Sequence, residues 1–418
     1  MIRAGLLLLL ALLHPLAVLA QPAPPPWGTD GRDVFMLVEA GGHRLSLFDA
    51  ERRTVLQRLD SEHALQGAPR FAPDGRHAFF ATAGGRVVKL DLWPLRVAAQ
   101  VQVGTALQAI ALSSDGRWLL AGNAAPRTAV LLDADLQAVK TFALQTLDGR
   151  RDSRVADVLD VAPRRSFVLA LQDIAELWEI SYDPQAPPIY DGLVHDYKMG
   201  EGIAKPGYHN VRRTPLDAPL RELASGPNAA YVIGATAPGA GDADAAGRAV
   251  VVNLDVRRAI ASLPIAGAPK PAGGLVFERQ GAPLLAMPNG RQGLVSVIDT
   301  RTWRPVASLT TPGPGEALRS QPGTPYAWVD AGDALAIFDT STLALVAQAR
   351  GPAGARLGPV QFTHDGRLAL TIAQEAGGEG SLLIHDAATF GLVARIPLER
   401  PVGLYRVLGP ALSSAPRQ

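Results

Sequence analysis

The chain has 418 residues, a formal net charge of +1 at pH 7 and no cysteine. The near-zero charge gives no electrostatic reason to expect nucleic-acid binding. The lack of cysteine excludes disulfides and a c-type haem held by cysteine thioethers. With 47% hydrophobic residues, 42 glycines and 34 prolines, the composition is that of a globular protein with a large core and many tight turns.

The N-terminus has the three parts of an export signal. Arg3 precedes an apolar run over residues 5–13, and Val-Leu-Ala at 18–20 offers a small-residue cleavage site. We therefore predict a signal peptide over residues 1–20, followed by a Pro-rich linker over residues 21–31. A histidine and a proline break the apolar run, which is short for a membrane span. An uncleaved anchor is the alternative; after cleavage we expect no stable membrane span.

One turn signal recurs along the rest of the chain. The sequence Pro-Asp-Gly-Arg at 73–76 returns as Asp-Gly-Arg at 115–117 and as His-Asp-Gly-Arg at 364–367. Each copy stands between two apolar runs, which is the pattern of a hairpin turn between two strands.

A second recurring element is stronger and covers the whole chain. An alternating apolar strand ends in an acidic residue, a few polar residues follow, and a short apolar strand comes next. The acidic residues lie 40 to 47 residues apart except for one gap of 76, and they are Asp49, Asp91, Asp133, Glu179, Asp255, Asp299, Asp339 and Asp386. We expect each of them to cap the turn after the third strand of its unit by accepting backbone N–H bonds.

Eight such units predict an all-β fold, an eight-bladed β-propeller over residues 32–418. Each unit is a small antiparallel sheet with two apolar faces, and neighbours in a ring bury those faces for each other. A pair of β-sandwiches is the alternative, which the regular spacing disfavours. The 76-residue gap predicts an insertion at about 185–220, at the rim or mouth of the propeller, where ligands bind in such folds.

Several strings also resemble a known family. They include "SRVADVLDVAPRRSFVLALQDIAELWEISYDP", "YDGLVHDYKMGEGIA", "RSQPGTPYAWVD" and "RPVGLYRV", and the match runs from about Asp33 to Val407. The chain resembles the d1-type haem propeller of cytochrome cd1 nitrite reductase and its relatives in haem d1 biosynthesis, above all the branch of the dihydro-haem d1 dehydrogenase. The resemblance implies an eight-bladed propeller that places haem d1 over a central channel, in the periplasm of denitrifying bacteria.

The resemblance also implies that haem-ligand histidines are replaced here. The family's proximal histidine position is matched by Gly67, and its distal positions by Asn289 and Gln321. Looser matching places Lys270 and Pro359 at two further histidine-like positions. Imidazole is the usual axial ligand of haem iron, so we do not expect nitrite reduction by the family mechanism. The amides of Asn289 and Gln321 remain able to hydrogen-bond a ligand, and Lys270 can pair with a carboxylate.

Other residues are candidates for contact with the macrocycle. Arg154 matches an arginine that contacts the macrocycle in the family, and Arg319 lies beside a replaced histidine; guanidinium groups suit the carboxylates of haem d1. Trp328 and Tyr405 have rings that can stack on a planar ligand, with core packing as the alternative. His195, in "VHDYKMGE", and Tyr405 are the candidates for acid–base catalysis. No motif for a protein-ligated metal ion is present.

The sequence thus predicts a periplasmic protein that binds or handles haem d1, or a precursor, without covalent attachment, in the maturation of nitrite reductase. Its partners are then the tetrapyrrole itself or a periplasmic maturation protein. Two alternatives are a propeller that has lost the haem and serves as an interaction scaffold, and an oxidoreductase that acts on a haem d1 precursor. For haem binding to hold, Arg154, Arg319, Lys270 and Gln321 must converge on one mouth.

Overall fold

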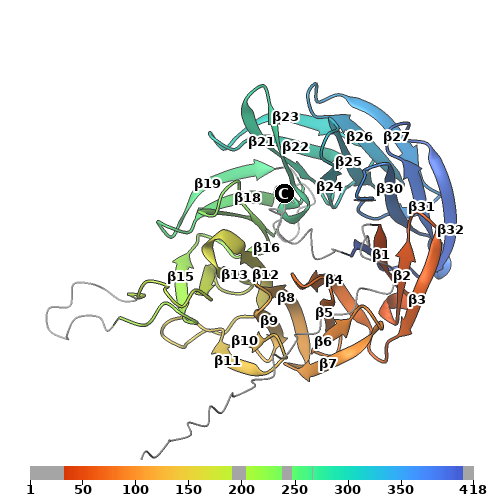
Figure 1. Cartoon of the computed structure of the whole chain (residues 1–418). Coiled ribbons are helices and arrows are strands. Elements are labelled where there is room, and N and C mark those ends of the chain that lie inside the picture. Colours follow the sequence, from red (N-terminus) through yellow and green to blue (C-terminus); the bar gives the residue numbers. More distant parts are fainter. Residues whose placement is uncertain (1–32, 191–203, 238–246, 266, 408–418) are drawn as a thin grey trace, which may run out of the picture.

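Eight antiparallel sheets arranged in a ring make up the structure, as the computed structural model shows for residues 33–190, 204–237, 247–265 and 267–407 (Figure 1). Seven sheets have four strands and the eighth has five. This arrangement confirms the predicted eight-bladed propeller and excludes the pair of sandwiches. We number the blades in chain order, so that blade 1 contains β1 to β3 and blade 8 ends with β32.

The innermost strand of each blade lies next to the centre of the ring, where it contacts the innermost strands of neighbouring blades. From blade 1 to blade 8 these strands are β33 (Gly403–Arg406), β4 (Leu65–Phe71), β8 (Ala106–Leu112), β12 (Val155–Val161), β16 (Leu220–Ser225), β20 (Leu275–Arg279), β24 (Leu318–Ser320), and β28 (Arg356–Leu357) with β29 (Gln361–Phe362). We call the face at which the innermost strands begin the upper face, and the opposite one the lower face.

The remaining strands follow outward in the same order in every blade. The second strands are β1 (Val34–Glu39), β5 (His77–Thr82), β9 (Trp118–Ala125), β13 (Ser166–Leu171), β17 (Tyr231–Thr236), β21 (Ala282–Pro288), β25 (Tyr326–Ala331) and β30 (Leu368–Gln374). The third strands are β2 (Arg44–Asp49), β6 (Arg86–Asp91), β10 (Thr128–Asp133), β14 (Glu176–Ser181), β18 (Gly247–Asn253), β22 (Leu294–Asp299), β26 (Ala334–Asp339) and β31 (Glu379–Asp386).

The outermost strands form the circumference of the ring. They are β3 (Thr54–Asp60), β7 (Arg96–Gln102), β11 (Ala138–Ala143), β15 (Val211–Pro215), β19 (Arg258–Ile265), β23 (Arg304–Thr310), β27 (Leu345–Arg350) and β32 (Leu392–Glu399). Helical structure in the described residues is limited to four single 3₁₀ turns, η1 (Ala40–Gly42), η2 (Ala162–Arg164), η3 (Pro271–Gly273) and η4 (Ala376–Gly378). The described residues contain no apolar helix of the length needed to cross a bilayer.

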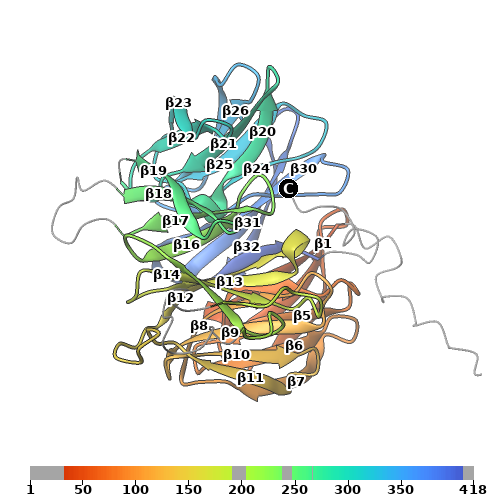
Figure 2. The ribbon, with the colours of Figure 1, turned by 90° about the vertical axis from the view of Figure 1, so that its left-hand side faces the viewer.

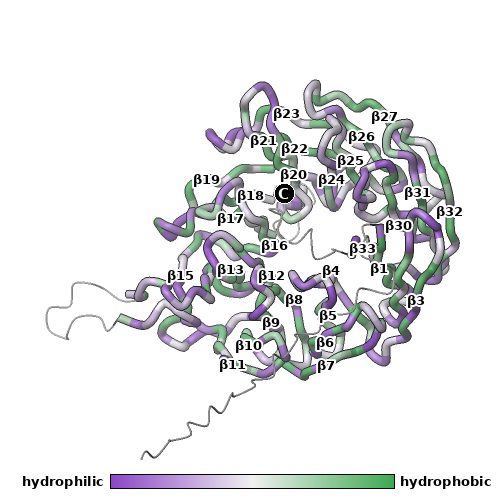
Figure 3. Tube along the Cα trace, viewed as in Figure 1, coloured by the Kyte–Doolittle hydropathy of each residue, from purple (hydrophilic) through white to green (hydrophobic). Residues whose placement is uncertain are grey.

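Successive side chains along a strand pack alternately into the two interfaces that its blade forms with the neighbouring blades. In β1, Val34 and Met36 pack with blade 2, whereas Phe35 and Leu37 pack with blade 8, because successive side chains of a strand point to opposite faces. Within the described residues, eight buried apolar clusters occupy the eight interfaces between neighbouring blades. Figure 3 shows the matching pattern, with hydrophobic strands and hydrophilic turns, and Figure 2 shows blades 4 and 5 side by side.

Blade 1 closes the ring with strands from both ends of the chain. Its innermost strand, β33, pairs antiparallel with β1, with Phe35 opposite Arg406 and Val38 opposite Gly403. The other three strands of this blade come from residues 34–60. Main-chain hydrogen bonds between the two ends therefore hold the first and last blades together.

The predicted turns are present. Pro73–Arg76 joins β4 to β5, and Asp74 accepts hydrogen bonds from the backbone N–H of Arg76 (2.8 Å) and His77 (3.0 Å). The copies at 115–117 and 364–367 likewise join the inner region of blades 3 and 8 to the second strand, and Asp115 and Asp365 accept backbone N–H bonds there. All three turns lie on the lower face.

The acidic caps are present in six of the eight blades. The third strand ends at the acidic residue and its carboxylate accepts a backbone N–H from the following turn, and these residues are Asp49, Asp91, Asp133, Asp299, Asp339 and Asp386. The expectation was wrong for the other two. In blade 5 the cap is Asn253, which accepts from the N–H of Asp255 (2.9 Å). In blade 4, Glu179 instead forms ion pairs with Arg164 and Arg212, both at 2.9 Å.

The insertion lies between the third and fourth strands of blade 4, so it spans the connection from β14 to β15 and ends before residue 211. The predicted range of about 185–220 covers most of this connection and also includes residues 211–215, which are the outermost strand. The described part of the connection packs on blade 3: His209 contacts the ring of Trp118, and Lys140 of β11 donates to the carbonyl of His209 at 2.7 Å. Lys140 is on the outermost strand, so these residues cover the outside of the ring and not its upper mouth.

We expect Leu37→Ala to lower the free energy of unfolding by about 2–5 kcal/mol, since it leaves a cavity between blades 8 and 1. Leu37 is 1% exposed. Urea unfolding followed by tryptophan fluorescence measures the change. Val97→Ala, at a position 43% exposed on β7, is the control and should shift stability by less than about 0.5 kcal/mol. Equal effects of the two changes would contradict the assignment of the core to the blade interfaces.

Candidate functional site

Irregular pairing marks the upper ends of four consecutive innermost strands. The register shifts between Gln66 and Arg70 in β4, and between Leu107 and Ala109 in β8. Equivalent shifts occur in β12 after Val155 and in β16 after Leu220. A β-bulge adds residues to one strand and redirects its side chains. Blades 2 to 5 therefore present extra residues at the same height of the ring.

The bulge residues are open to solvent although they belong to innermost strands. Gly67, Ala68, Gln108 and Arg221 are exposed, and Ala156 is half-exposed. Each innermost strand is covered by its own sheet and by the two neighbouring blades, so an exposed residue on it faces the centre of the ring. We call these bulge residues, together with the residues that contact them, the upper mouth.

Gly67, the position at which the resemblance implies a proximal histidine, borders open space. Its φ of +72° suits glycine, and no atom lies within 4 Å of where a Cβ would stand. The Tyr405 hydroxyl donates to the Gly67 carbonyl at 3.3 Å. Burial raises the pKa of Tyr405, while the positive charge of Arg70 opposes that shift. A phenol thus stands beside the open position in blade 2.

Arg154 directly precedes β12 and lies at the upper mouth. Its guanidinium contacts both carboxylate oxygens of Asp173, at 3.0 Å from Nε and 2.6 Å from Nη2. This bidentate bond lowers the pKa of Asp173 to about 2. With the Gln172 amide oriented to satisfy its neighbours, its oxygen accepts from Arg154 Nη2 at 3.2 Å and from Arg221 Nη1 at 2.8 Å. Two guanidinium groups therefore meet between blades 4 and 5.

Lys270 also lies at the upper face, but it is held by the protein's own carboxylates. Its Nζ is 2.8 Å from Glu316 and 3.7 Å from Glu222. Glu316 in turn pairs with Arg356 at 2.9 Å. Burial lowers the pKa of Lys270, but the hydrogen bond to Glu316 and the two negative charges outweigh it and raise the pKa. Blades 5 to 8 are thus linked by a chain of ion pairs.

Two carboxyl groups of the mouth were not predicted from the sequence. Glu222, next to Arg221 in the bulge of β16, accepts from the N–H of Ala272 at 3.0 Å, and burial raises its pKa. Asp157, in the equivalent position of β12, accepts from the N–H of Leu223 at 2.9 Å, and burial raises its pKa as well. Carboxyl groups whose pKa is raised by burial are candidates for proton transfer.

Arg319 and Asp330 lie deeper in blade 7. Arg319 is half-buried in β24 and donates to the carbonyl of Leu318 at 2.7 Å. Burial lowers its pKa, and the charge of Asp330 opposes this. Asp330 is buried and accepts from the backbone N–H groups of Glu316 (3.1 Å) and Ala317 (2.7 Å). Burial raises the pKa of Asp330 to about 6.

Gln321 and Asn289 do not face the upper mouth with Arg154. Gln321 follows β24 and donates to the carbonyl of Gly366, in a lower-face turn of blade 8, at 2.7 Å. It is five residues beyond Glu316, or about 16 Å along an extended strand. Asn289 is 1% exposed, and its oxygen accepts from the N–H of Ala268, Arg291 and Gln292 within 3.2 Å. The four predicted residues therefore do not all converge on one mouth.

The remaining candidates lie elsewhere. Trp328 is 1% exposed in the core between blades 7 and 8, where Phe362 and Phe390 contact its ring, so core packing and not ligand stacking is its role here. His195 falls outside the described residues. The described residues contain no group of three or more histidine and acidic side chains that could hold a metal ion.

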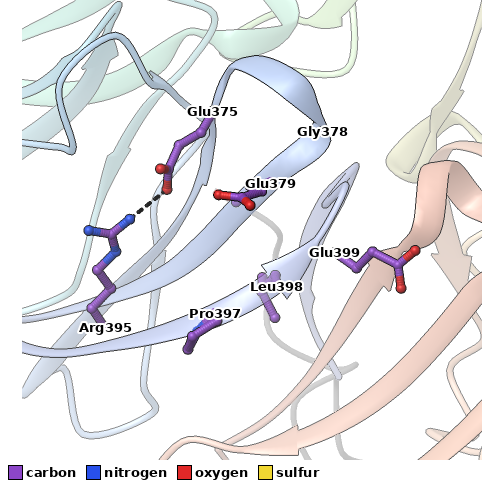
Figure 4. A pocket seen from close by; sticks show the side chains of 8 residues that line it. Glu375, Gly378, Glu379, Arg395, Pro397, Leu398 and Glu399 are labelled. Carbon is purple, nitrogen blue, oxygen red and sulfur yellow. Dashed lines mark hydrogen bonds and ion pairs between the residues drawn. The ribbon is translucent and has the colours of Figure 1, made fainter.

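A separate hollow of about 660 Å³ lies on the outer flank of blade 8 (Figure 4). It is lined by the ion pair of Glu375 with Arg395 (2.8 Å), and by Glu379 and Glu399. It shares no residue with the upper mouth.

We expect Asp330→Asn to stabilise the protein at pH 8 by about 2 kcal/mol, because a carboxyl with a raised pKa favours folding only while it is protonated. That contribution is complete below pH 4 and is lost as the pH rises through about 6, so the gain should vanish near pH 4. Urea midpoints at both pH values test this. Asp339→Asn is the control: the pKa of this exposed cap is lowered by its bonds to Ser341, so it should not stabilise at pH 8.

Comparison with known proteins relates the chain to one family. The family model described as the cytochrome D1 heme domain matches residues 29–191 and 227–409. The residues between the two matched ranges, 192–226, include part of the blade 4 insertion. The dihydro-heme d1 dehydrogenase of Pseudomonas aeruginosa is 35% identical over 401 residues, covering 94% of this chain and 74% of that protein. Protein NirF of Stutzerimonas stutzeri is 26% identical, covering 95% and 96%.

A solved structure agrees with these relatives. It is the dihydro-heme d1 dehydrogenase NirN in complex with DHE, with a TM-score of 0.79 and 34% identity over 94% of this chain and 79% of that chain. The designed Ika8 protein, with a TM-score of 0.54 and 13% identity, shares the fold alone. Because the family model and the 35% identical relative each cover most of the chain, this protein belongs to the cytochrome d1 haem domain family.

Proposed function

We propose that this protein binds haem d1 or its dihydro precursor, without covalent attachment, at the upper mouth. The convergence of Arg154, Arg319, Lys270 and Gln321 expected from the sequence is not met. The proposal therefore rests on Arg154 together with bulge residues that the sequence did not single out. The observation that carries the proposal is the run of bulges in blades 2 to 5, which opens the mouth and places Arg221 beside Arg154. Guanidinium groups suit the carboxylates of such a macrocycle. The relatives' names, and the complex of one of them with DHE, support the same ligand class.

The residues of the upper mouth are better suited to bind the ligand's carboxylates than to ligate its iron. A haem supplies a redox-active iron and a conjugated ring when it is bound. Gly67, Asn289 and Gln321 provide no imidazole, whereas the Tyr405 phenol, which donates to the Gly67 carbonyl, has haem-ligand chemistry. In this chain Arg154 and Arg221 would hold carboxylates, Tyr405 would lie against one face, and the open space at Gly67 would admit the ring.

We propose further that residues 1–20 direct export, so that the propeller works in the periplasm and passes its ligand to the maturation of nitrite reductase. The apolar segment at 5–13 and the small residues at 18–20 support export. N-terminal sequencing of the protein from a periplasmic extract identifies the cleavage point.

The binding proposal predicts that purified protein shifts the absorption spectrum of haem d1 and elutes with it. Ala68→Trp should weaken binding at least about tenfold, because an indole at this exposed bulge position fills the mouth beside Gly67. Val97→Trp, on the outermost strand of the same blade, is the matched control and should bind normally. If the wild-type spectrum does not change and no ligand co-elutes, the interaction-scaffold alternative is favoured.

A second candidate function is dehydrogenation of a ligand side chain. The observation that favours it is Glu222, a half-buried carboxyl with a raised pKa adjacent to Arg221. Converting a saturated carboxylate side chain to its unsaturated form breaks two C–H bonds and releases two protons and two electrons. Glu222 would accept the first proton, and a separate electron-transfer protein would take the electrons, since the chain has no cysteine to anchor a c-type haem.

For this second function we expect turnover of dihydro-haem d1, with an added one-electron acceptor, to rise with pH as Glu222 loses its proton. Glu222→Gln should abolish that pH dependence and lower the rate at least about a hundredfold while binding persists. Glu51→Gln, in the exposed turn that joins β2 to β3, is the control. Undiminished turnover in Glu222→Gln would rule out this residue as the base.

A further inference from the structure

Glu222, the carboxyl that the second candidate function needs as its base, is held at both of its oxygens. Oε1 accepts from the backbone N–H of Ala272 in η3 at 3.0 Å, which fixes the carboxyl against the connection between blades 5 and 6. Oε2 is 3.7 Å from Nζ of Lys270, the residue that directly precedes η3. A cation therefore lies beside the oxygen that is left for a proton.

Lys270 makes its closer contact with a second carboxylate. Its Nζ is 2.8 Å from Oε2 of Glu316, against 3.7 Å for Glu222. Glu316 also pairs through Oε1 with Arg356 at 2.9 Å, and its backbone N–H donates to the buried Asp330 at 3.1 Å. Glu316 is thus fixed from two sides, and it draws Lys270 away from full contact with Glu222.

Two glycines make this arrangement possible. A Cβ on Gly290 would stand 2.6 Å from Cε of Lys270, so the lysine stem passes close to the turn that follows β21. A Cβ on Gly273, within η3, would overlap the carbonyl oxygen of Glu316, so η3 packs directly against the main chain of blade 7. Close main-chain packing, and not only the reach of a flexible lysine, therefore sets the distances between Lys270 and its two partners.

Several charges act on Glu222 from the surrounding elements. Burial is the main cause that raises its pKa, and the charges of Asp157 in β12 and of Glu316 act in the same sense. Lys270 and the backbone N–H bond oppose them. Arg221, the preceding residue, is directed to blade 4 instead. Lys270 is thus the cation that offsets two nearby carboxylates at this base.

We propose that Lys270 is a positioning residue for Glu222, shared with Glu316 so that it orients the base without neutralising it. This inference rests on the proposed dehydrogenation and assigns the residues that control its base. A general base is most effective when its pKa lies near the working pH. Full contact with the lysine would make the carboxylate a weak base, and loss of the lysine would leave it protonated.

The titration of Glu222 can be followed in the ligand-free protein. ¹³C NMR of protein labelled at the glutamate side-chain carboxyls gives the midpoint, and Glu222→Gln identifies the resonance. Lys270→Gln should raise the midpoint by about one pH unit, since a nearby cation favours the carboxylate. Glu316→Gln should lower it by about half a pH unit, because a repelling charge is removed and Lys270 becomes free to approach Glu222. Two changes in one chain of ion pairs therefore have opposite effects.

Gly290→Ala tests the geometry without changing a charge. The added Cβ displaces the stem of Lys270, so the midpoint should rise, though by less than in Lys270→Gln. Lys270→Arg keeps the cation and should restore most of the wild-type midpoint. The controls are Lys205→Gln, at an exposed position in the connection from β14 to β15, and Glu51→Gln, which remove the same charges elsewhere and should leave the midpoint unchanged.

Turnover provides the second readout. With dihydro-haem d1 and a one-electron acceptor, the pH at which the rate rises should shift in the same directions, and Lys270→Arg should recover the rate. If Lys270→Gln moves the Glu222 midpoint no more than Lys205→Gln does, or if Glu316→Gln moves it upward, the positioning role is wrong even where turnover is found. If the midpoints shift as expected but wild type neither binds nor oxidises the ligand, the proposed function fails while the coupling of Lys270 to Glu222 is upheld. Circular dichroism of each variant verifies that the propeller is intact.

Discussion

Each blade has two apolar faces, and this single constraint accounts for the ring. Strands such as β1 and β13 are buried at every position, with alternate residues serving opposite interfaces. A sheet of this kind is stable only with a neighbour on both sides, so the row of blades has to close on itself. The pairing of β33 with β1 completes the closure, and the ends of the innermost strands are thereby brought to two opposite mouths.

Features that depend on local chemistry were predictable from the sequence. The number of blades and most strand ends could be predicted from the alternation of apolar and polar residues, the Asp-Gly turns and the acidic caps. Blade 4 departs from the pattern because Glu179 is drawn into ion pairs with Arg164 and Arg212, and the strand continues to Ser181. The end of the insertion was misplaced because β15, Val-Arg-Arg-Thr-Pro, has two adjacent arginines and lacks the alternation of a strand.

The site was only partly predictable, since a sequence match does not tell which face of the ring a residue reaches. Arg154 lies at the upper mouth, whereas Gln321 stands at the far end of a short inner strand and Trp328 is in the core. Arg221 and Glu222 were missed because they belong to a bulge. In the sequence, such a bulge is indicated by two residues between large apolar neighbours, as in Leu-Arg-Glu-Leu at 220–223 or Val-Ala-Asp-Val at 155–158. A regular strand, whose side chains alternate strictly between the two faces, has a single residue there.

Closure through β33 also bears on the order in which the protein is made. Ribosomes release the N-terminal segment first, so β1 to β3 emerge without their innermost strand and wait for residues 403–406. Until then one edge of blade 1 has unpaired main-chain groups and blade 8 lacks its neighbour. Contacts that are so far apart in sequence form slowly, and a partly synthesised chain therefore remains open. A chain in that state is compatible with threading through a narrow pore. The ring closes only after the last strand, residues 403–406, has been synthesised and pairs with β1.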